Sequence, residues 1–405
     1  MFMFVKDVKP RIIKDSRGEK TVEIILKTYE GKFYCSAPAG KSTGIHEVAS
    51  YNKDGLNKSI ELTTEFCEKV KNKNFLIKVV DDLMQLQSMI DRFEKHYGKL
   101  GGNVVYALQG VFLKAAAKDN NKQIWEFIFE DVNKGRKPRL PMPVGNCVGG
   151  GLHSKFLNRK RPDFQEFLLI PHEETFSKAI SKNIRAYEYA RSLLKTKSKN
   201  DESAWRTDKS NEEVLFILMK VLEKYDVRLG LDVATSSFFE NGYYHYKNKK
   251  LVRDRLDQID YMKRIIEKYN LFYIEDPMGE DDFSGFKEIL DSMGKRNTLI
   301  VGDDLTTTNV VRLNKALRGK SINAIIIKPN QIGSILEVKK VVEICKKKHI
   351  KMIFSHRSGE TKDTLLADLA VGFDADFIKC GILGQERLVK HKRLLDIEKN
   401  LHKKN

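Results

Sequence analysis

The feature that most constrains the fold is a series of short apolar runs, each ending in charged residues. The run at 272–274 is followed by Glu275-Asp276-Pro277, and the run at 299–301 by Gly302-Asp303-Asp304. Four further runs end at Asp232, Lys328, His356-Arg357 and Lys379. From Glu275 onward the charged ends recur every 23 to 28 residues, a spacing typical of the β/α units of a closed barrel. The sequence therefore predicts a parallel barrel whose charged strand ends gather at one mouth.

Length and composition indicate a globular protein without a membrane anchor. The chain has 405 residues, of which 41% are hydrophobic and 32% charged, and no run approaches the length of a membrane span. The apolar stretch at the start of the chain ends at Lys6, so it is too short to be the apolar region of a signal peptide. The five cysteines are scattered and never spaced as Cys-x-x-Cys, which argues against a disulfide framework or a structural zinc site. We expect a reducing, cytoplasmic location.

The formal net charge of +18 raises the question of an anionic partner. The basic residues are spread along the chain, apart from short clusters such as Lys346-Lys347-Lys348. Dispersed charge is typical of a solvated surface, so we expect no specific nucleic-acid partner and no membrane partner.

The first part of the chain follows a different pattern from the barrel. Strand-like runs at 21–28 and 32–37 flank a glycine turn, and helical patterns follow at 60–70, 79–97 and 103–117. We predict an α/β protein with an N-terminal α+β domain at 1–134, followed by a modified eight-stranded, TIM-like β/α barrel at 138–405.

Three of the predicted strand ends carry acids, namely Asp232, Glu275 and Asp303. Carboxylates that converge without a cation repel each other, and hard oxygen ligands favour Mg²⁺. The same mouth would hold several cations: Lys328, His356, Arg357 and Lys379. This combination suits a small substrate with several negative charges, although a purely structural network of ion pairs would have the same composition.

Several motifs resemble those of the enolase family, the phosphopyruvate hydratases of glycolysis, and the similarity extends from about residue 10 to the end of the chain. They are Asp15-Ser16-Arg17-Gly18, Ser42-Thr43-Gly44, Gln165-Glu166-Phe167, Gly230-Leu231-Asp232-Val233-Ala234, Ile274-Glu275-Asp276-Pro277, Asp303-Asp304-Leu305-Thr306, Lys328-Pro329-Asn330-Gln331-Ile332-Gly333, Ser355-His356-Arg357-Ser358-Gly359-Glu360-Thr361 and Glu386-Arg387-Leu388. The resemblance implies reversible dehydration of 2-phosphoglycerate to phosphoenolpyruvate by a homodimer. It also implies two Mg²⁺ ions, the second of which arrives with the substrate.

The resemblance also implies roles for individual residues. Lys328 matches the general base and Glu202 the acid that assists loss of the hydroxyl group. The metal ligands would be Asp232, Glu275, Asp303 and Ser42. The remaining substrate contacts would be His153, Glu166, His356, Arg357, Ser358 and Lys379, together with the metal ligands Glu275 and Asp303 and the base Lys328.

Two positions depart from the family pattern. Ser203-Ala204 stands where the family has two glycines after the acid, and Lys41 replaces a small residue in the loop at 40–44. Because glycine allows backbone angles that serine and alanine adopt less readily, we expect Glu202 to be less well aimed and dehydration to lag behind removal of the α-proton.

Two other functions fit parts of the sequence. One is an enolase-like barrel with an altered substrate or a weakened dehydration step. The other is a basic binding protein that keeps the fold, although a binding protein has no need of a lysine base.

Overall fold

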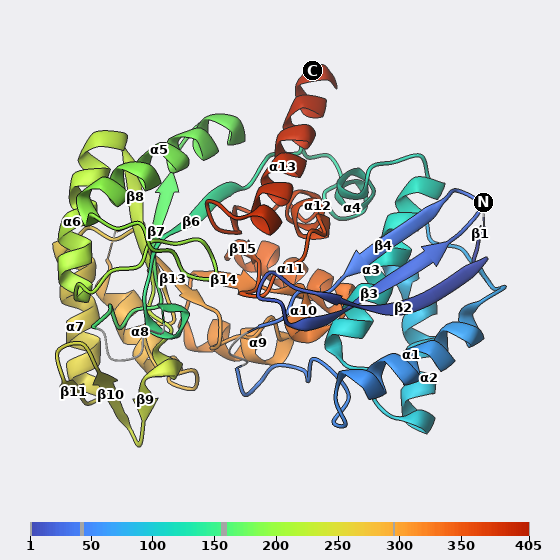
Figure 1. The fold of residues 1–405 in the computed structure, drawn as a ribbon, viewed down its shortest axis with the longest axis horizontal. Helices are drawn as coiled ribbons and strands as arrows, with labels where there is room; N and C mark the ends of the chain where they lie inside the picture. The colour runs from blue at the N-terminus through green and yellow to red at the C-terminus, as the bar shows by residue number, and fades with distance from the viewer. Residues whose placement is uncertain (1, 41–43, 155–159, 295, 405) are drawn as a thin grey trace. The chain divides into compact units, whose positions relative to one another are not determined.

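The computed structural model describes residues 2–40, 44–154, 160–294 and 296–404 (Figure 1). The chain forms two compact units. The first comprises Met1–Leu140, Lys328–Ile344 and Phe354–Ala375, and the second comprises Pro141–Ile327, Cys345–Ile353 and Asp376–Asn405.

The first unit contains an antiparallel sheet in the order β2-β3-β4, formed by β2 (Asp7–Lys14), β3 (Lys20–Lys27) and β4 (Lys32–Ser36). Helix α3 (Gly102–Asp119) packs against β3 and β4. A Cβ atom at Gly110 would lie 2.5 Å from Sγ of Cys35, so this close approach of helix and sheet requires a glycine.

The other elements of the first unit are mostly helical. They are β1 (Met3–Phe4), β5 (Asn74–Phe75), α1 (Leu56–Val70), η1 (Val80–Leu83), α2 (Met84–Tyr97), α4 (Ile124–Val132), α10 (Pro329–Ile332), most of α11 (Ile335–Lys348), and α12 (Leu365–Gly372). The hairpin and helices that the sequence predicts before residue 120 are present, with shifts of a few residues at their ends.

A closed barrel in the order β12-β13-β14-β15-β16-β6-β7-β8 confirms the predicted fold class. Its strands are β6 (Met142–Gly149), β7 (Glu166–Pro171), β8 (Val227–Asp232), β12 (Tyr273–Glu275), β13 (Leu299–Gly302), β14 (Ala324–Ile327), β15 (Lys351–Ser355) and β16 (Phe377–Lys379). Buried aliphatic side chains such as Leu168, Val301 and Ile326 form its core.

Strand β7 runs antiparallel to both of its neighbours, β6 and β8. Its first residue, Glu166, therefore pairs with Asp232 at the last residue of β8, whereas β8 and β12 run parallel and place Asp232 beside Glu275. Because β7 is reversed, the carboxylate at its first residue lies level with the carboxylates at the last residues of β8 and β12.

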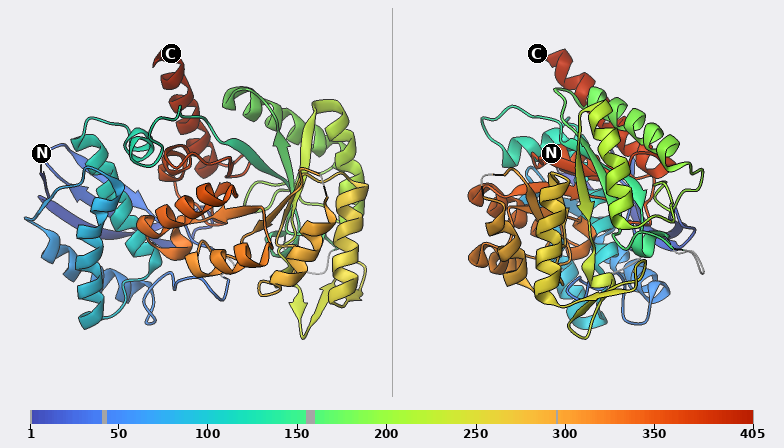
Figure 2. Two further views of the ribbon diagram at one scale, coloured as in Figure 1. Left: turned by 180° about the vertical axis from the view of Figure 1, so that it is seen from behind. Right: turned by 90° about the vertical axis from the view of Figure 1, so that its left-hand side faces the viewer.

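Helices α5, α6 and α7 lie on the outside of the barrel (Figures 1 and 2). The helices of the second unit are α5 (Phe176–Leu194), α6 (Asn211–Tyr225), α7 (Arg255–Lys268), α8 (Phe283–Ser292), α9 (Val310–Gly319) and α13 (Gln385–Lys404). A small sheet of β9 (Phe239–Glu240), β10 (Tyr243–Tyr246) and β11 (Leu251–Arg253) follows β8, with the short helix η3 (Thr235–Ser237) between them. Among the helices that are described, none has the length and apolar character needed to cross a membrane.

Candidate active site

The ammonium group of Lys379 lies among three carboxylates inside the barrel. Its Nζ atom is 2.9 Å from Oδ2 of Asp232, 2.8 Å from Oε2 of Glu275 and 3.0 Å from Oε2 of Glu166. The four side chains are almost completely buried. We refer to these four residues as the Lys379 cluster.

The Lys379 cluster has more acids than bases. Burial by itself lowers the pKa of Lys379, but Asp232, Glu166 and Glu275 raise it well above the usual lysine value, so the lysine is protonated. Burial raises the pKa of Asp232, and Glu166 adds to this effect against the opposing influence of Lys379. One positive charge therefore faces three acids, an imbalance that a divalent cation could reduce.

A second acidic group consists of Asp276, Asp303 and Asp304, whose ligand atoms lie within 4.8 Å of one another. The carboxylate of Asp276 accepts the backbone N–H groups of Asp303 at 3.0 Å and of Asp304 at 2.7 Å. Burial raises the pKa of Asp276 well above its usual value, and Asp304 and Asp303 raise it further. A set of hard carboxylate oxygens fits Mg²⁺. Asp303 belongs to this group and to the ligand set predicted from the sequence.

The predicted acid Glu202 is also buried, with 2% of its surface exposed. Its Oε2 atom accepts a hydrogen bond from Nδ2 of Asn146 at 3.2 Å. Residue Asn146 lies on β6, beside an irregularity in the pairing of β6 with β7. Such irregularities redirect side chains and are common near functional sites.

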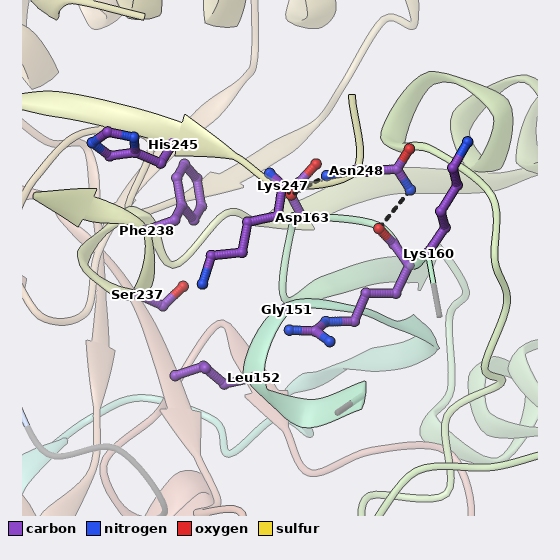
Figure 3. A pocket seen from close by; sticks show the side chains of 10 residues that line it. Gly151, Leu152, Lys160, Asp163, Ser237, Phe238, His245, Lys247 and Asn248 are labelled. Carbon is purple, nitrogen blue, oxygen red and sulfur yellow. Dashed lines mark hydrogen bonds between the residues drawn. The ribbon is translucent and has the colours of Figure 1, made fainter. Parts of the chain in front are cut away.

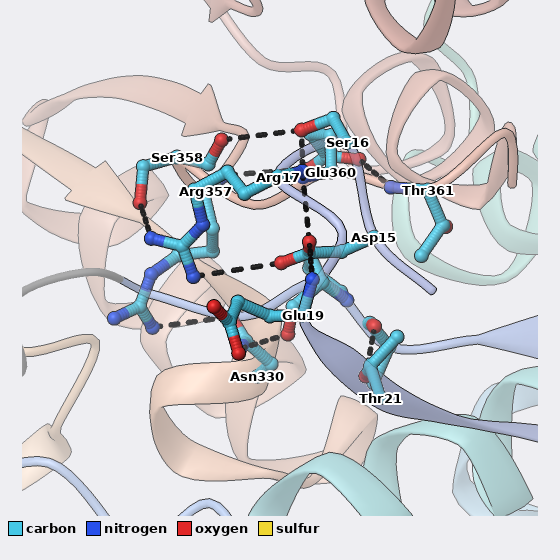
Figure 4. A network of polar contacts seen from close by, with 12 residues as sticks. Asp15, Ser16, Arg17, Glu19, Thr21, Asn330, Arg357, Ser358, Glu360 and Thr361 are labelled. Atoms are coloured by element: carbon cyan, nitrogen blue, oxygen red, sulfur yellow. Dashed lines mark hydrogen bonds and ion pairs between the residues drawn. The ribbon is translucent and has the colours of Figure 1, made fainter. Parts of the chain in front are cut away.

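The predicted phosphate contact Arg357 lies in the first unit, after β15. Its two terminal nitrogens donate to the two carboxylate oxygens of Glu47 at 2.9 Å and 3.0 Å, and Nη1 also lies 3.3 Å from Oδ1 of Asn330. The neighbouring Ser358 accepts a hydrogen bond from Nη1 of Arg17 at 3.1 Å. The two groups are joined through Glu360, which accepts the backbone N–H of Arg357 at 3.1 Å and donates its own backbone N–H to Ser16 at 3.1 Å (Figure 4).

The other predicted residues of the first unit follow strands as expected. Lys328 comes directly after β14, is partly exposed and occupies the N-cap position of α10 without a side-chain capping hydrogen bond. His356 follows β15 and is buried.

Two predicted residues cannot be placed in full. Ser42, like Lys41, lies outside the described residues. His153 lies in the short helix η2 (Gly151–Ser154), but its side chain is outside the described part of the chain.

A separate pocket with a volume of about 250 Å³ lies in the second unit (Figure 3). It is lined by residues from the loop after β6 and from the region around β10: Gly151, Leu152, Lys160, Arg161, Asp163, Ser237, Phe238, His245, Lys247 and Asn248. The carboxylate of Asp163 accepts hydrogen bonds from the backbone N–H groups of Lys247 at 2.7 Å and Asn248 at 3.1 Å. The pocket is rich in basic side chains, and none of the residues named here belongs to the predicted site.

Eight residues of these networks were absent from the predicted site: Asp276, Asp304, Asn146, Glu47, Asn330, Arg17, Glu360 and Ser16. Asp276 had a visible signal, because it follows Glu275 directly at a strand end. No pattern in the sequence marks Asn146 or Glu47, since each forms a hydrogen bond with a residue far away in the sequence.

Comparison with known proteins agrees with the fold and with the motifs. The model of the enolase N-terminal domain matches residues 5–128, and that of the enolase C-terminal TIM barrel domain matches residues 137–405. A protein named enolase from Thermoplasma acidophilum is 36% identical, with 98% of each chain covered. Enolases from Methanosphaera stadtmanae and Methanothermobacter thermautotrophicus are each 35% identical, covering 98% and 99% of this chain and 97% and 98% of their own.

Proposed function

The chain belongs to the enolase family, a family of phosphopyruvate hydratases, and we propose that its buried acids and lysines carry out the reversible dehydration of 2-phosphoglycerate to phosphoenolpyruvate. The enzyme is a hydro-lyase, and its substrate is a phosphorylated carboxylate. The observation that carries the assignment of roles is the Lys379 cluster, in which one protonated lysine faces three buried acids.

The carboxylates Asp232, Glu275 and Asp303 would hold one Mg²⁺, and Ser42 would help to hold a second. The ions would stabilise the negative charge that develops on the substrate carboxylate when the α-proton leaves. Asp276 would keep Asp303 in place, because its carboxylate binds the backbone of Asp303 and of the next residue.

The reaction needs a base for the α-proton and an acid for the hydroxyl group. Lys328 takes the proton from the α-carbon, and the electron pair of the broken C–H bond then forms the new double bond. The C–O bond to the hydroxyl group breaks as Glu202 gives it a proton, so that water leaves. For Lys328 to act as a base its amine must be neutral, a state that nearby positive charge favours.

The other side chains bind and orient the substrate. Protonated Lys379 places a positive charge beside the substrate carboxylate, and Arg357 with Ser358 binds the phosphate group. His153, Glu166 and His356 complete the set of contacts. Glu47 would orient the guanidinium group of Arg357 through its paired hydrogen bonds.

The remaining predictions from the sequence are kept as proposals. We propose a homodimer, a cytoplasmic location, and the division into domains at 1–134 and 138–405. The binding-only alternative has no use for a buried lysine among three acids, whereas the alternative of an altered substrate would keep this cluster and differ in its phosphate contacts.

The direct test is the ultraviolet absorbance assay for phosphoenolpyruvate formation, run with and without Mg²⁺. Rapid formation of product with Mg²⁺ and none in excess chelator supports the proposal. Absence of product under both conditions, from protein with a normal unfolding transition, contradicts it.

A further inference from the structure

The turn that carries Glu202 has a backbone that is unusual for its residues. Ser203 has a φ of 63°, in the left-handed region that favours glycine, and it stands where the family has the first of two glycines. A serine in this conformation costs of order 1 kcal/mol and persists where surrounding contacts hold it. The structure supplies such contacts.

The side chain of Asn200 closes the turn. Its Oδ1 atom accepts the backbone N–H of Glu202 at 3.0 Å and that of Ala204 at 2.9 Å. Backbone bonds from Asn200 N–H to the Ala204 carbonyl at 2.9 Å, and from Ser203 N–H to the Asn200 carbonyl at 3.1 Å, complete the turn. The acceptor oxygen of Asn200 therefore binds the backbone on both sides of Ser203.

Two aromatic residues hold the same turn from outside. The hydroxyl group of Tyr187 donates to the carbonyl of Ser203 at 2.5 Å, and Nε1 of Trp205 donates to the carbonyl of Tyr187 at 3.0 Å. The two rings are stacked, with centroids 4.7 Å apart. Trp205 also exchanges backbone hydrogen bonds with β6, which joins the turn to the barrel.

The carboxyl group of Glu202 is held by a second asparagine. Asn146 and Glu202 are each 2% exposed, and Nδ2 of Asn146 donates to Oε2 of Glu202. A hydrogen bond accepted by one carboxyl oxygen directs the acidic proton to the other oxygen. Asn146 thus orients both the side chain and the proton that it would donate.

We propose that Asn200 and Asn146 are positioning residues for Glu202, and that Asn200 does the work which two glycines do elsewhere in the family. The side-chain oxygen of Asn200 accepts hydrogen bonds from the backbone of the turn. The side-chain nitrogen of Asn146 donates a hydrogen bond to the carboxyl group of Glu202. The inference rests on the proposed role of Glu202 as the acid. It reverses the expectation from the sequence, because a turn held in this way aims Glu202 without glycine.

Substitution of each asparagine by aspartate distinguishes the two roles. Asn200→Asp keeps the acceptor oxygen, and Nδ2 of Asn200 has no hydrogen-bond partner among the described residues, so no donor bond to them is lost. Asn146→Asp replaces the donor with a carboxylate that cannot donate when ionised. The two substitutions are nearly isosteric, which keeps the test valid if an alanine variant fails to fold.

The test measures exchange of the α-hydrogen of 2-phosphoglycerate in deuterated water and dehydration in the same samples. The variants are Asn200→Ala, Asn200→Asp, Asn146→Ala and Asn146→Asp. We expect Asn200→Ala and both Asn146 variants to lose dehydration by on the order of 10- to 100-fold, with exchange within about twofold of the natural protein, because only the acid is displaced. We expect Asn200→Asp to recover most of the dehydration rate.

Two further arms complete the experiment. In the natural protein, exchange and dehydration should proceed at matched rates, and Ser203→Gly with Ala204→Gly should change neither by more than about twofold, since the turn is already held. Dehydration that lags in the natural protein and recovers in the glycine variant would overturn the proposal.

Other outcomes separate the possible failures. If exchange and dehydration fall together in Asn200→Ala and aspartate restores neither, Asn200 has only a structural role and the proposal is wrong. If all four variants match the natural protein, positioning by these residues is excluded. If the natural protein catalyses neither exchange nor dehydration, the proposed function itself has failed.

Discussion

The ammonium group of Lys379 lies 2.8 Å from Oε2 of Glu275, and neither side chain has appreciable contact with solvent. Tyr273 donates a hydrogen bond to the same oxygen at 2.5 Å. Glu275 is a proposed Mg²⁺ ligand, so Lys379 and the metal ion would neutralise the same buried acids. Removal of the lysine should therefore make the protein more dependent on the ion.

Lys379→Met should abolish activity and lower stability in chelator by about 3 to 5 kcal/mol, because it leaves buried carboxylates without their cation. Saturating Mg²⁺ should raise the melting temperature of this variant by more than that of the natural protein. Thermal unfolding at several Mg²⁺ concentrations measures both effects. The matched control is Lys287→Met, at an exposed lysine on α8 paired with Asp291. Equal Mg²⁺ responses of Lys379→Met and the natural protein would disprove a shared role.

Asp303→Ala should remove activity while the fold is kept, because one of three hard ligands is lost from the metal site. Isothermal titration with Mg²⁺ should show weaker binding, and circular dichroism should be unchanged. Asp291→Ala, at an exposed acid of α8, serves as the control. Full activity of the purified natural protein in excess chelator would show that no metal site of this kind is needed.

Lys328→Ala should lose exchange of the α-hydrogen, because no other group is proposed to take that proton. Measurement in deuterated water separates this step from dehydration. Lys340→Ala, which removes an exposed lysine paired with Glu337, should exchange normally. An undiminished exchange rate in Lys328→Ala would mean that the base has been assigned to the wrong residue.

His391 on α13 should make stability fall at mildly acid pH. It is 3% exposed and packs against Phe176, and burial lowers its pKa from 6.5 to about 4. A histidine whose folded pKa is depressed stabilises the fold above its unfolded pKa, and this contribution is lost as pH falls from about 6.5 towards 4. The loss should reach at most about 3 kcal/mol.

Urea unfolding of the natural protein and of His391→Leu at pH 7 and pH 4.5 measures this contribution. The natural protein should lose more stability between the two pH values than the variant does. His402→Leu, at an exposed position on the same helix, should behave like the natural protein. An identical pH dependence of His391→Leu and the natural protein would exclude His391 as the cause.

The net charge of +18 should produce only weak, salt-sensitive binding to nucleic acid. Scattered lysines release counterions without reading bases, so affinity should fall steeply as salt rises. Fluorescence anisotropy with labelled DNA and RNA of unrelated sequences, at low and physiological salt, tests this. A tight complex that depends on base sequence at physiological salt would favour the binding-protein alternative.

The sequence by itself was sufficient to predict the barrel and most of its charged strand ends. An apolar run followed by an acid or a lysine is a local pattern, and its repetition at a nearly constant interval already implies strands that end on the same side. Asp232, Glu275 and Lys379 could be named in this way, and the motifs around them were enough to indicate the enolase family.

Only the tertiary structure decided how these residues are held. The reversal of β7, which pairs Glu166 with Asp232, depends on hydrogen bonds between strands that are separated by more than fifty residues. The contact of Asn146 with Glu202 likewise joins residues 56 positions apart, and that of Glu47 with Arg357 joins residues 310 positions apart. Such contacts leave no periodic trace in the sequence, because one polar residue in a loop or strand looks the same whether or not it meets a partner. For this reason the missing glycines after Glu202 suggested a poorly positioned acid, and the hydrogen bonds of Asn200 and Tyr187 to this turn are visible only in the folded chain.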